Sequence, residues 1–186
     1  MSIKKNHDLI RVAEEIIKCD ICKENKIGVA VPGEGNPDAS IVFIGEAPGK
    51  KESVTGKPFI GRSGQLLRKM IREILGFDDL KDVYITSPVK YLPVHGTPIP
   101  SEIAHGRIHL IKQLEIINPQ IVVLMGNVAI KGVLDEMIPI KKRHGEIIEK
   151  DGRRYFLTLH PAAGLRFPPL KKIIEEDFIF LKKEIL

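Results

Sequence analysis

The regular alternation of short apolar runs with longer segments of helical periodicity most constrains the fold of this chain. The apolar runs are typical of buried strands because they are short, rich in β-branched residues and ended by glycine or a turn. A hairpin through Asp151-Gly152 joins the last two of them. The expected strands are Ser40–Ile44, Val83–Ile85, Ile121–Leu124, Glu146–Lys150 and Tyr155–Leu159.

Segments with apolar residues at helical spacing separate these strands. The expected helices are residues 8–18, Ser63–Leu75, Ser101–Ile117, a short helix from Asn127, and about Leu170–Lys183. Strands that alternate with helices form a mainly parallel sheet covered on both faces. We therefore expect one domain over residues 1–186, a three-layer α/β/α sandwich around a central, mainly parallel sheet of about four strands.

Composition narrows the class of protein. The chain has 186 residues, of which 43% are hydrophobic and 28% charged, as is ordinary for a globular protein. No apolar run approaches the roughly 20 residues of a membrane span. The amphipathic N-terminus carries acidic residues, unlike a signal or transit peptide, so we expect a cytoplasmic protein. The net charge of +5 is compatible with a polyanionic partner.

Loops of unusual composition follow four of the expected strands. They are Gly45–Gly49, Thr86–Lys90, Gly126–Ala129 and His160–Gly164. The carboxyl ends of parallel strands lie at one edge of a sheet, and ligands bind outside that edge in such folds. The sequence therefore predicts that the four loops converge on one site.

Three side chains near these loops could carry chemistry. Glu46 is the only ionisable group in the Gly45–Gly49 loop, which lacks the spacing of a dinucleotide fingerprint or a P-loop. Phe59, held between glycines and a proline, could stack on a planar base. His160 ends a strand and could stabilise a developing anion. Each alone also fits a structural role, as a solvated Glu, a core Phe or a structural His.

Together, the motifs resemble those of family 4 uracil-DNA glycosylases, the thermostable group of bacteria and archaea. The resemblance covers nearly the whole chain, and several spaced motifs in the same order are more specific than any one of them. The matching segments are Gly45–Gly49 with Glu52, Gly56–Leu67, Val83–Thr86, Ile121–Gly126 and His160–Ala162.

The resemblance implies a hydrolase of base excision repair that acts on uracil flipped out of DNA. Glu46 would orient or activate water, or offset positive charge on the sugar, and His160 would stabilise the leaving uracil anion. The implied base-binding residues are Gly45, Ala47, Gly49, Phe59 and Ser87. The implied DNA-binding residues are Leu165 as a wedge, Arg166 and Lys90.

The chain departs from the family at the base-reading position. Where the family has an Asn whose amide reads the uracil edge, this chain has Ser87 followed by Pro88. A hydroxyl has one donor and can rotate to suit different partners. We therefore expect uracil activity with relaxed selectivity toward other deaminated bases. A milder departure is Ser53, in place of the usual Asp.

The cysteines depart from the family as well. The resemblance implies a [4Fe–4S] cluster bound by four cysteines, but this chain has only Cys19 and Cys22. Tyr91 and Gly106 occupy the other two positions. A conventional cluster is therefore not expected, because such clusters need thiolates. The pair could hold zinc with His95, His105 or His109, or hold nothing; an empty site is favoured because no further ligands fall at a recognised spacing.

Two other functions remain open at this point. One is a non-catalytic DNA-binding relative that has lost the cluster and the base-reading Asn. The other is an N-ribosyl hydrolase of free nucleosides. Retention of Glu46, Phe59 and His160 argues against the first, and the basic excess with Leu165 and Arg166 argues against the second.

Overall fold

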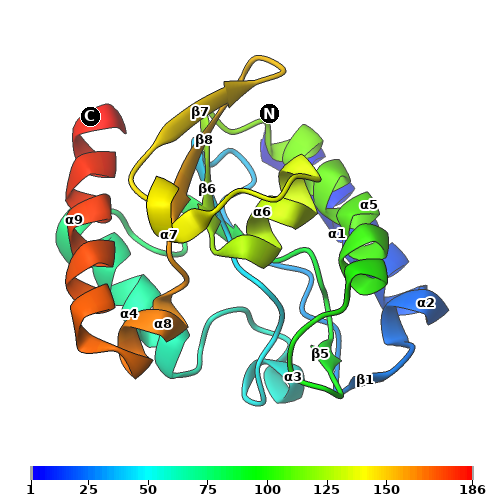
Figure 1. The fold of residues 1–186 in the computed structure, drawn as a ribbon. Helices are drawn as coiled ribbons and strands as arrows, with labels where there is room; N and C mark the ends of the chain where they lie inside the picture. Colours follow the sequence, from blue (N-terminus) through cyan, green and yellow to red (C-terminus); the bar gives the residue numbers. More distant parts are fainter. Residues whose placement is uncertain (1, 186) are drawn as a thin grey trace.

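A six-stranded sheet forms the centre of the protein in a computed structural model that describes residues 2–185 (Figure 1). The strand order is β2-β4-β3-β6-β8-β7. The strands span Glu34–Gly35 (β2), Ile41–Ile44 (β3), Val83–Thr86 (β4), Ile121–Met125 (β6), Ile147–Lys150 (β7) and Arg153–Thr158 (β8).

The four inner strands are parallel, and the two edge strands are antiparallel to their neighbours. This confirms the predicted mainly parallel sheet and the predicted hairpin of β7 with β8. Strand β2 was not expected, because a two-residue segment that contains a glycine carries no apolar pattern. A second small sheet pairs β1 (Lys26–Ile27) with β5 (Leu92–Pro93).

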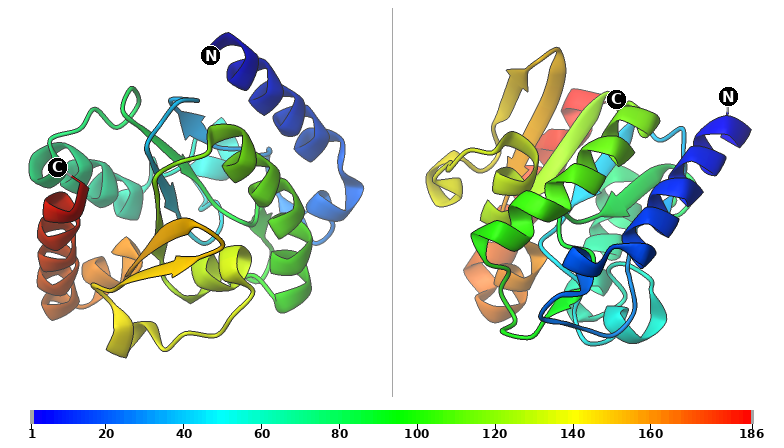
Figure 2. Two further views of the ribbon diagram at one scale, coloured as in Figure 1. Left: turned by 90° about the horizontal axis from the view of Figure 1, so that it is seen from above. Right: turned by 90° about the vertical axis from the view of Figure 1, so that its right-hand side faces the viewer.

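Helices cover both faces of the central sheet (Figure 2). One layer contains α1 (Ser2–Lys18), α5 (Pro100–Ile117) and α6 (Asn127–Leu134). The other contains α4 (Arg62–Met70), the π-helical segment η1 (Ile71–Leu75) and α9 (Pro168–Ile185). The short helices are α2 (Asp20–Lys23), α3 (Glu52–Thr55), α7 (Ile140–Arg143) and α8 (Pro161–Arg166).

The predicted helices are present with shifted bounds. The segment Ser63–Leu75 is divided between α4 and η1, and Gly61 rather than Ser63 occupies the N-cap position, without a side-chain hydrogen bond. The first helix begins at Ser2, well before residue 8. Helix boundaries depend on capping contacts more than on periodicity, which explains these differences.

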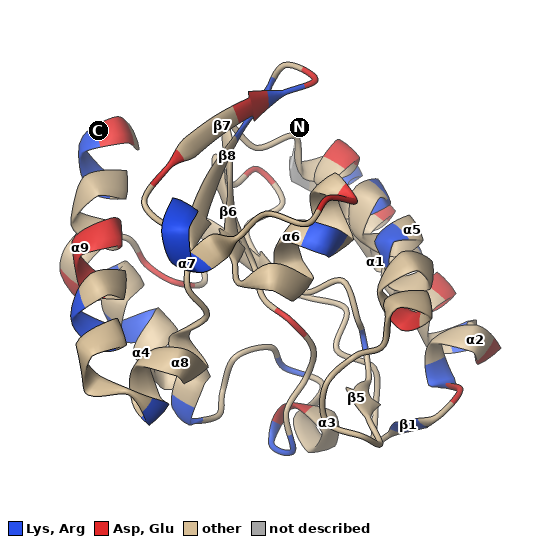
Figure 3. Cartoon of the chain, in the orientation of Figure 1, with Lys and Arg blue, Asp and Glu red and all other residues tan. Residues whose placement is uncertain are grey.

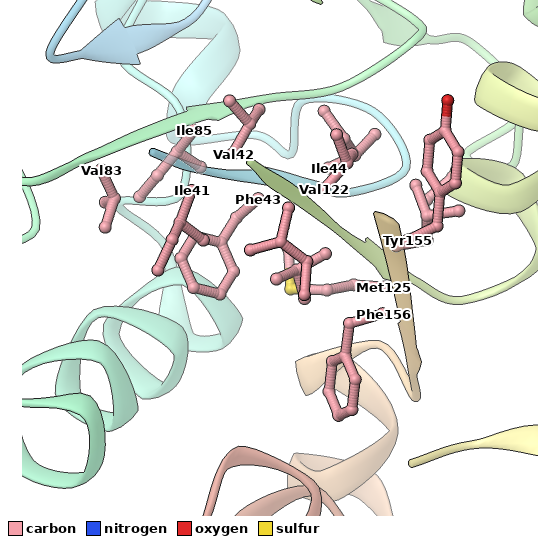
Figure 4. Close-up of a cluster of buried hydrophobic side chains, with 14 of the residues drawn as sticks. Ile41, Val42, Phe43, Ile44, Val83, Ile85, Val122, Met125, Tyr155 and Phe156 are labelled. Carbon is pink, nitrogen blue, oxygen red and sulfur yellow. The ribbon is translucent and has the colours of Figure 1, made fainter. Parts of the chain in front are cut away.

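Each face of the sheet carries a layer of apolar side chains that packs against the helices. Phe43 and Phe156 point to one side of the sheet, and Val42 and Tyr155 point to the other (Figure 4). Phe43 stacks on Phe178 of α9 with ring centroids 5.9 Å apart. All four residues of β3 are buried. A strand that is apolar on both faces needs helices on both sides, and this fixes its central place in the sheet.

The strand register brings the predicted loops together. Ile44 lies opposite both Thr86 and Leu124, and Leu124 lies opposite Leu157. The segments after β3, β4, β6 and β8 therefore leave the sheet at the same edge. Within residues 2–185, no helix is both long enough and apolar enough to cross a membrane.

Candidate active site

A cavity of about 110 Å³ lies at this carboxyl edge of the sheet. Its walls come from the loop after β3, the segment before α4, the loop after β4 and the start of α8. Among the residues that line it are Ala47, Gly49, Glu52, Phe59, Ser87 and His160. The structure thus brings together most of the residues that the sequence singled out.

His160 presents one ring nitrogen to the site. It caps the N-terminus of α8, where its Nδ1 accepts a hydrogen bond from the backbone N–H of Ala162 at 3.2 Å. The proton of a neutral ring must then sit on Nε2. Burial lowers the pKa of His160 to about 4, so the ring is neutral near pH 7. The side chain can therefore donate a hydrogen bond from Nε2 without carrying a charge.

Phe59 lies beside His160, with ring centroids 5.9 Å apart and an angle of 35° between the planes. Its backbone adopts φ +53°, a left-handed conformation that is uncommon for an aromatic residue. A Cβ at Gly45 would lie 2.3 Å from Cζ of Phe59 and 3.6 Å from Nε2 of His160. Gly45 is therefore needed for the close approach of the Phe59 ring to the end of β3, whereas the distance to His160 would be an ordinary contact.

Glu52 was quoted in the sequence motif without a role, and the structure gives it one. Its Oε1 accepts from the backbone N–H groups of Ile60 at 2.7 Å and Gly61 at 2.6 Å. Its Oε2 accepts from the N–H of Gly49 at 3.1 Å. The buried carboxylate therefore ties the loop after β3 to the segment that carries Phe59.

Arg68 on α4 holds the same segment from the other side, and sequence reasoning missed it. Its Nε donates to the carbonyl of Phe59 at 3.0 Å, and one terminal nitrogen donates to the carbonyl of Pro58 at 2.8 Å. Asp79 and Glu34 pair with the guanidinium. An arginine at a helical position carries no sequence signal that separates this contact from a solvated side chain.

Glu46 lies next to the cavity and is not among the residues that line it. It follows β3 by two residues and is half-buried. Burial raises the pKa of its carboxyl group above the ordinary value. Its place at the carboxyl end of β3, next to Ala47 of the cavity wall, is compatible with the expected catalytic role, which stays a prediction.

Ser87 lines the cavity, and its hydroxyl is already engaged. Oγ donates to the backbone carbonyl of Val89 at 2.8 Å. A hydroxyl has a single hydrogen, so only its lone pairs remain for a ligand. In this conformation, Ser87 can accept a hydrogen bond from a base and cannot donate one.

The expectation that Lys90 contacts DNA is wrong. Lys90 is only 2% exposed. Its Nζ donates to Thr86 Oγ1 at 2.6 Å, to Gln113 Oε1 at 2.7 Å and to the carbonyl of Pro32 at 3.1 Å. Burial lowers its pKa to about 7. An ammonium group enclosed by internal acceptors cannot reach a phosphate, so Lys90 supports the loop after β4 instead.

A shallow groove of about 500 Å³ continues from the cavity, with which it shares Gly49, Glu52 and Ser63. Most of its other lining residues are basic: they are Lys50, Lys51, Gly61, Arg62, Ala162, Leu165 and Arg166. The basic positions beside α3 and at the end of α8 lie on the same lower side of the molecule (Figure 3). Leu165 is 39% exposed. Leu165 and Arg166 thus line the groove that continues from the cavity, and their contact with DNA stays a prediction.

The two cysteines lie outside this cavity. Cys19 follows α1, and Cys22 lies in α2. Sγ of Cys19 is 3.1 Å from Nε2 of His105 on α5. His95, which the sequence also offered as a ligand, is exposed and belongs to no cluster of metal-binding side chains among residues 2–185.

Comparison with known proteins gives a consistent result. The model of the uracil DNA glycosylase superfamily matches residues 32–179. The type-4 uracil-DNA glycosylase of Saccharolobus solfataricus is 42% identical over 97% of this chain and 87% of its own length. The type-4 uracil-DNA glycosylase of Sulfurisphaera tokodaii is 40% identical over 91% of this chain and 81% of its own length. The type-4 uracil-DNA glycosylase of Thermotoga maritima is 40% identical over 93% of this chain and 94% of its own length.

Proposed function

The chain belongs to the uracil DNA glycosylase superfamily, and we propose that it is a repair enzyme that hydrolyses the N-glycosidic bond of uracil in DNA. One observation carries the proposal. A neutral histidine with a free Nε2–H and an aromatic ring face the same small cavity, and that cavity opens into a basic groove.

The size of the cavity supports a flipped base as its occupant. Pockets for drug-sized ligands usually measure about 300–1,000 Å³. A cavity of about 110 Å³ accommodates a single ring and leaves a sugar outside. A base inside a duplex must leave the stack before its glycosidic bond can be attacked. Phe59 offers the surface on which the extruded base stacks.

The reaction separates charge, and the site offers one residue for the negative charge and one for the positive charge. The C1′–N1 bond breaks, and its electron pair leaves with uracil, so the sugar becomes cationic and uracil anionic. Nε2–H of His160 stabilises the anion by a hydrogen bond that strengthens as the bond breaks. A water oxygen bonds to C1′. Glu46 in its ionised form accepts the proton of that water, as carboxylates do in glycoside hydrolysis.

The groove supports DNA rather than a free nucleoside as the substrate. Lys50, Lys51, Arg62 and Arg166 lie along it and can neutralise phosphates. The half-exposed Leu165 can enter the gap that a flipped base leaves. A nucleoside hydrolase has no need of a basic groove that extends past its base pocket.

The test is single-turnover excision from single- and double-stranded oligonucleotides that contain uracil, followed by alkaline cleavage of abasic sites. We expect wild type to cleave and His160→Ala to slow chemistry far more than it weakens DNA binding. Phe59→Ala should lose stacking worth about 1–3 kcal/mol. His7→Ala, a change at an exposed histidine on α1, is the control. Near wild-type rates in both site variants would show that the site is elsewhere, and a wild type that binds DNA without excising uracil would refute the activity.

A further inference from the structure

The iron–sulfur cluster implied by the resemblance to family 4 does not fit the residues of this chain. Only two cysteines are present. Tyr91 packs in a small apolar cluster with Cys22, Val12 and Ile16. A Cβ at Gly106 would lie 2.2 Å from the backbone oxygen of Pro88, so α5 sits too close to that loop to carry any side chain there. Neither of the two remaining positions can therefore supply a ligand to an iron–sulfur cluster.

Another set of metal-binding side chains occupies this region. One ligand atom from each of Cys19, Cys22, His105 and His109 lies within 4.8 Å of all the others. The cysteines come from the junction of α1 with α2, and the histidines come from α5. Residues four positions apart lie on the same face of a helix, so α5 presents both rings to the cysteines.

We propose that these four side chains bind a single structural zinc ion. The cysteines are separated by two residues and the histidines by three, which are spacings of structural Cys₂His₂ zinc sites. The sequence favoured an empty pair because no third and fourth ligand fell at a recognised spacing from the cysteines, since His105 and His109 lie more than eighty positions away. The tertiary contact between α2 and α5 supplies the missing half of the pattern.

The separation of the ligand atoms supports one ion rather than a cluster. Zinc lies about 2.0–2.3 Å from nitrogen and sulfur ligands, so in a tetrahedral site two ligands of one ion are about 3.3–3.8 Å apart. Atoms that all lie within 4.8 Å of one another reach this spacing when the most distant of them approach by about 1 Å. In a two-iron cluster, the ligands are divided between two metal atoms and must lie farther apart.

The surroundings suit a closed structural site. Cys22 and His109 are buried. The buried Nδ1 of His109 has no hydrogen-bond partner among residues 2–185, and Glu15 Oε2 lies 3.9 Å from it. A carboxylate near the second nitrogen of a ligating histidine is the usual outer contact of such sites. Two thiolates balance the charge of Zn²⁺, and four protein ligands leave no open position for catalysis.

The proposed ion would join the N-terminal part of the chain to the central sheet. It would link the end of α1 and the start of α2 to α5, which packs against the sheet. A cavity of about 280 Å³ beside Cys22 and His105 gives the metal a path of entry. We therefore expect the metal to stabilise the fold without taking part in the reaction.

The first test is metal analysis of the untagged full chain, expressed in medium that contains both zinc and iron and purified without chelators. We expect about one zinc per chain and no stoichiometric iron. Apoprotein prepared under reducing conditions should bind Co²⁺ with the visible absorption of a tetrahedral site and a thiolate-to-cobalt charge-transfer band. Two or four irons per chain, or no uptake of either Zn²⁺ or Co²⁺ by folded apoprotein, would overturn the proposal.

Variants identify the ligands. Cys22→Ser and His105→Ala should each lose the zinc and the cobalt spectrum, while His95→Ala, at an exposed histidine outside the group, should keep both. If a ligand variant fails to fold, wild type alone is decisive: a chelator should lower its Tm, and Zn²⁺ should restore it. Unchanged metal content in Cys22→Ser and His105→Ala, or a Tm that the chelator does not change, would contradict the proposed site.

Discussion

Among single residues, Ser87 is the one that we expect to read the base, because it lines the cavity. Its hydrogen is donated to Val89, so it offers a base only an acceptor. An amide at this position would both accept and donate, and a good two-point contact is worth about 1–3 kcal/mol of discrimination. Uracil, thymine and hypoxanthine all carry a ring N–H group, and a hydroxyl oxygen can accept a hydrogen bond from it. The geometry therefore agrees with the expectation of relaxed selectivity.

The prediction is that wild type excises uracil together with hypoxanthine, xanthine or mispaired thymine, and that Ser87→Asn narrows this range toward uracil by about 1–3 kcal/mol. The measurement is a panel of oligonucleotides that each carry one of these bases. Ser87→Ala, which removes the acceptor, is the matched control. The argument fails if wild type acts on uracil alone and Ser87→Asn changes no rate.

Glu46 and His160 differ in how pH controls them. Burial raises the pKa of Glu46 above its ordinary value, whereas burial lowers the pKa of His160 to about 4. As the pH falls from neutrality, Glu46 is protonated first and loses its capacity to accept a proton from water. His160 keeps its neutral form over the same range. With Glu46 as the proposed base, we expect the acid side of the rate profile to follow the titration of its carboxyl group.

We predict that the single-turnover rate of wild type falls as the pH drops through the raised pKa of Glu46. Glu46→Gln should be slower at neutral pH and should show no such fall, because its amide does not titrate in this range. Rates measured across the acid range at constant ionic strength test this. An unchanged acid limb in Glu46→Gln would assign the titration to another group.

At the scale of elements, the site depends on the contact between the start of α3 and the entry to α4. Glu52, the first residue of α3, accepts hydrogen bonds from three backbone N–H groups, and these bonds fix both segments. Gly64 of α4 packs against the backbone of Phe59, where a Cβ would lie 2.0 Å from the carbonyl carbon. The left-handed φ of Phe59 is held by these neighbours, since its own conformational preference opposes it.

Glu52→Gln should therefore destabilise the protein by about 1–3 kcal/mol, because an NH₂ group then faces backbone donors that it cannot pair with. Excision should slow as well, since Phe59 loses its fixed position. Denaturant unfolding and single-turnover rates measure the two effects. The control is Glu73→Gln, at an exposed glutamate that pairs with Lys69, where the loss should stay below about 1 kcal/mol. Equal stability of the two variants would contradict the proposed clamp.

At the scale of the whole molecule, the basic side chains are distributed unevenly with respect to the sheet. The groove at the carboxyl edge carries Lys50, Lys51, Arg62 and Arg166, beside the mouth of the base cavity. The end of α9 also carries basic residues, but it lies on the opposite side of the molecule (Figure 3). The net charge of +5 alone could not separate these two regions.

We predict that replacing Lys50 and Lys51 by alanine weakens binding to duplex DNA and reduces the slope of log K against log salt by about 0.9 per lost phosphate contact. Replacing Lys182 and Lys183 at the end of α9 removes the same charge and should leave the slope nearly unchanged. Titrations at several salt concentrations give both slopes. Equal reductions in the two double variants would show that net charge, and not the groove, binds the DNA.

The sequence by itself determined which segments form the inner strands and main helices, because side-chain periodicity is a local property that nearest neighbours along the chain reveal. It also determined that four loops meet at one edge, since parallel strands connected by helices allow no other arrangement. His160 could be found because it stands in one of these loops, and Phe59 because glycines and a proline surround it. The short elements β2, α3 and α8 were not predicted, because a segment of a few residues is too short to show a periodic pattern of apolar side chains.

Only the tertiary structure decided which charged and polar side chains face inward. Lys90 is buried because Gln113 and Pro32, far away in sequence, supply its acceptors. Glu52 holds the Phe59 segment through backbone groups, which no residue letter records. Cys19 and His105 meet across 86 positions through the packing of α2 on α5. Such contacts depend on how distant elements pack, and a linear pattern contains only local information about that packing.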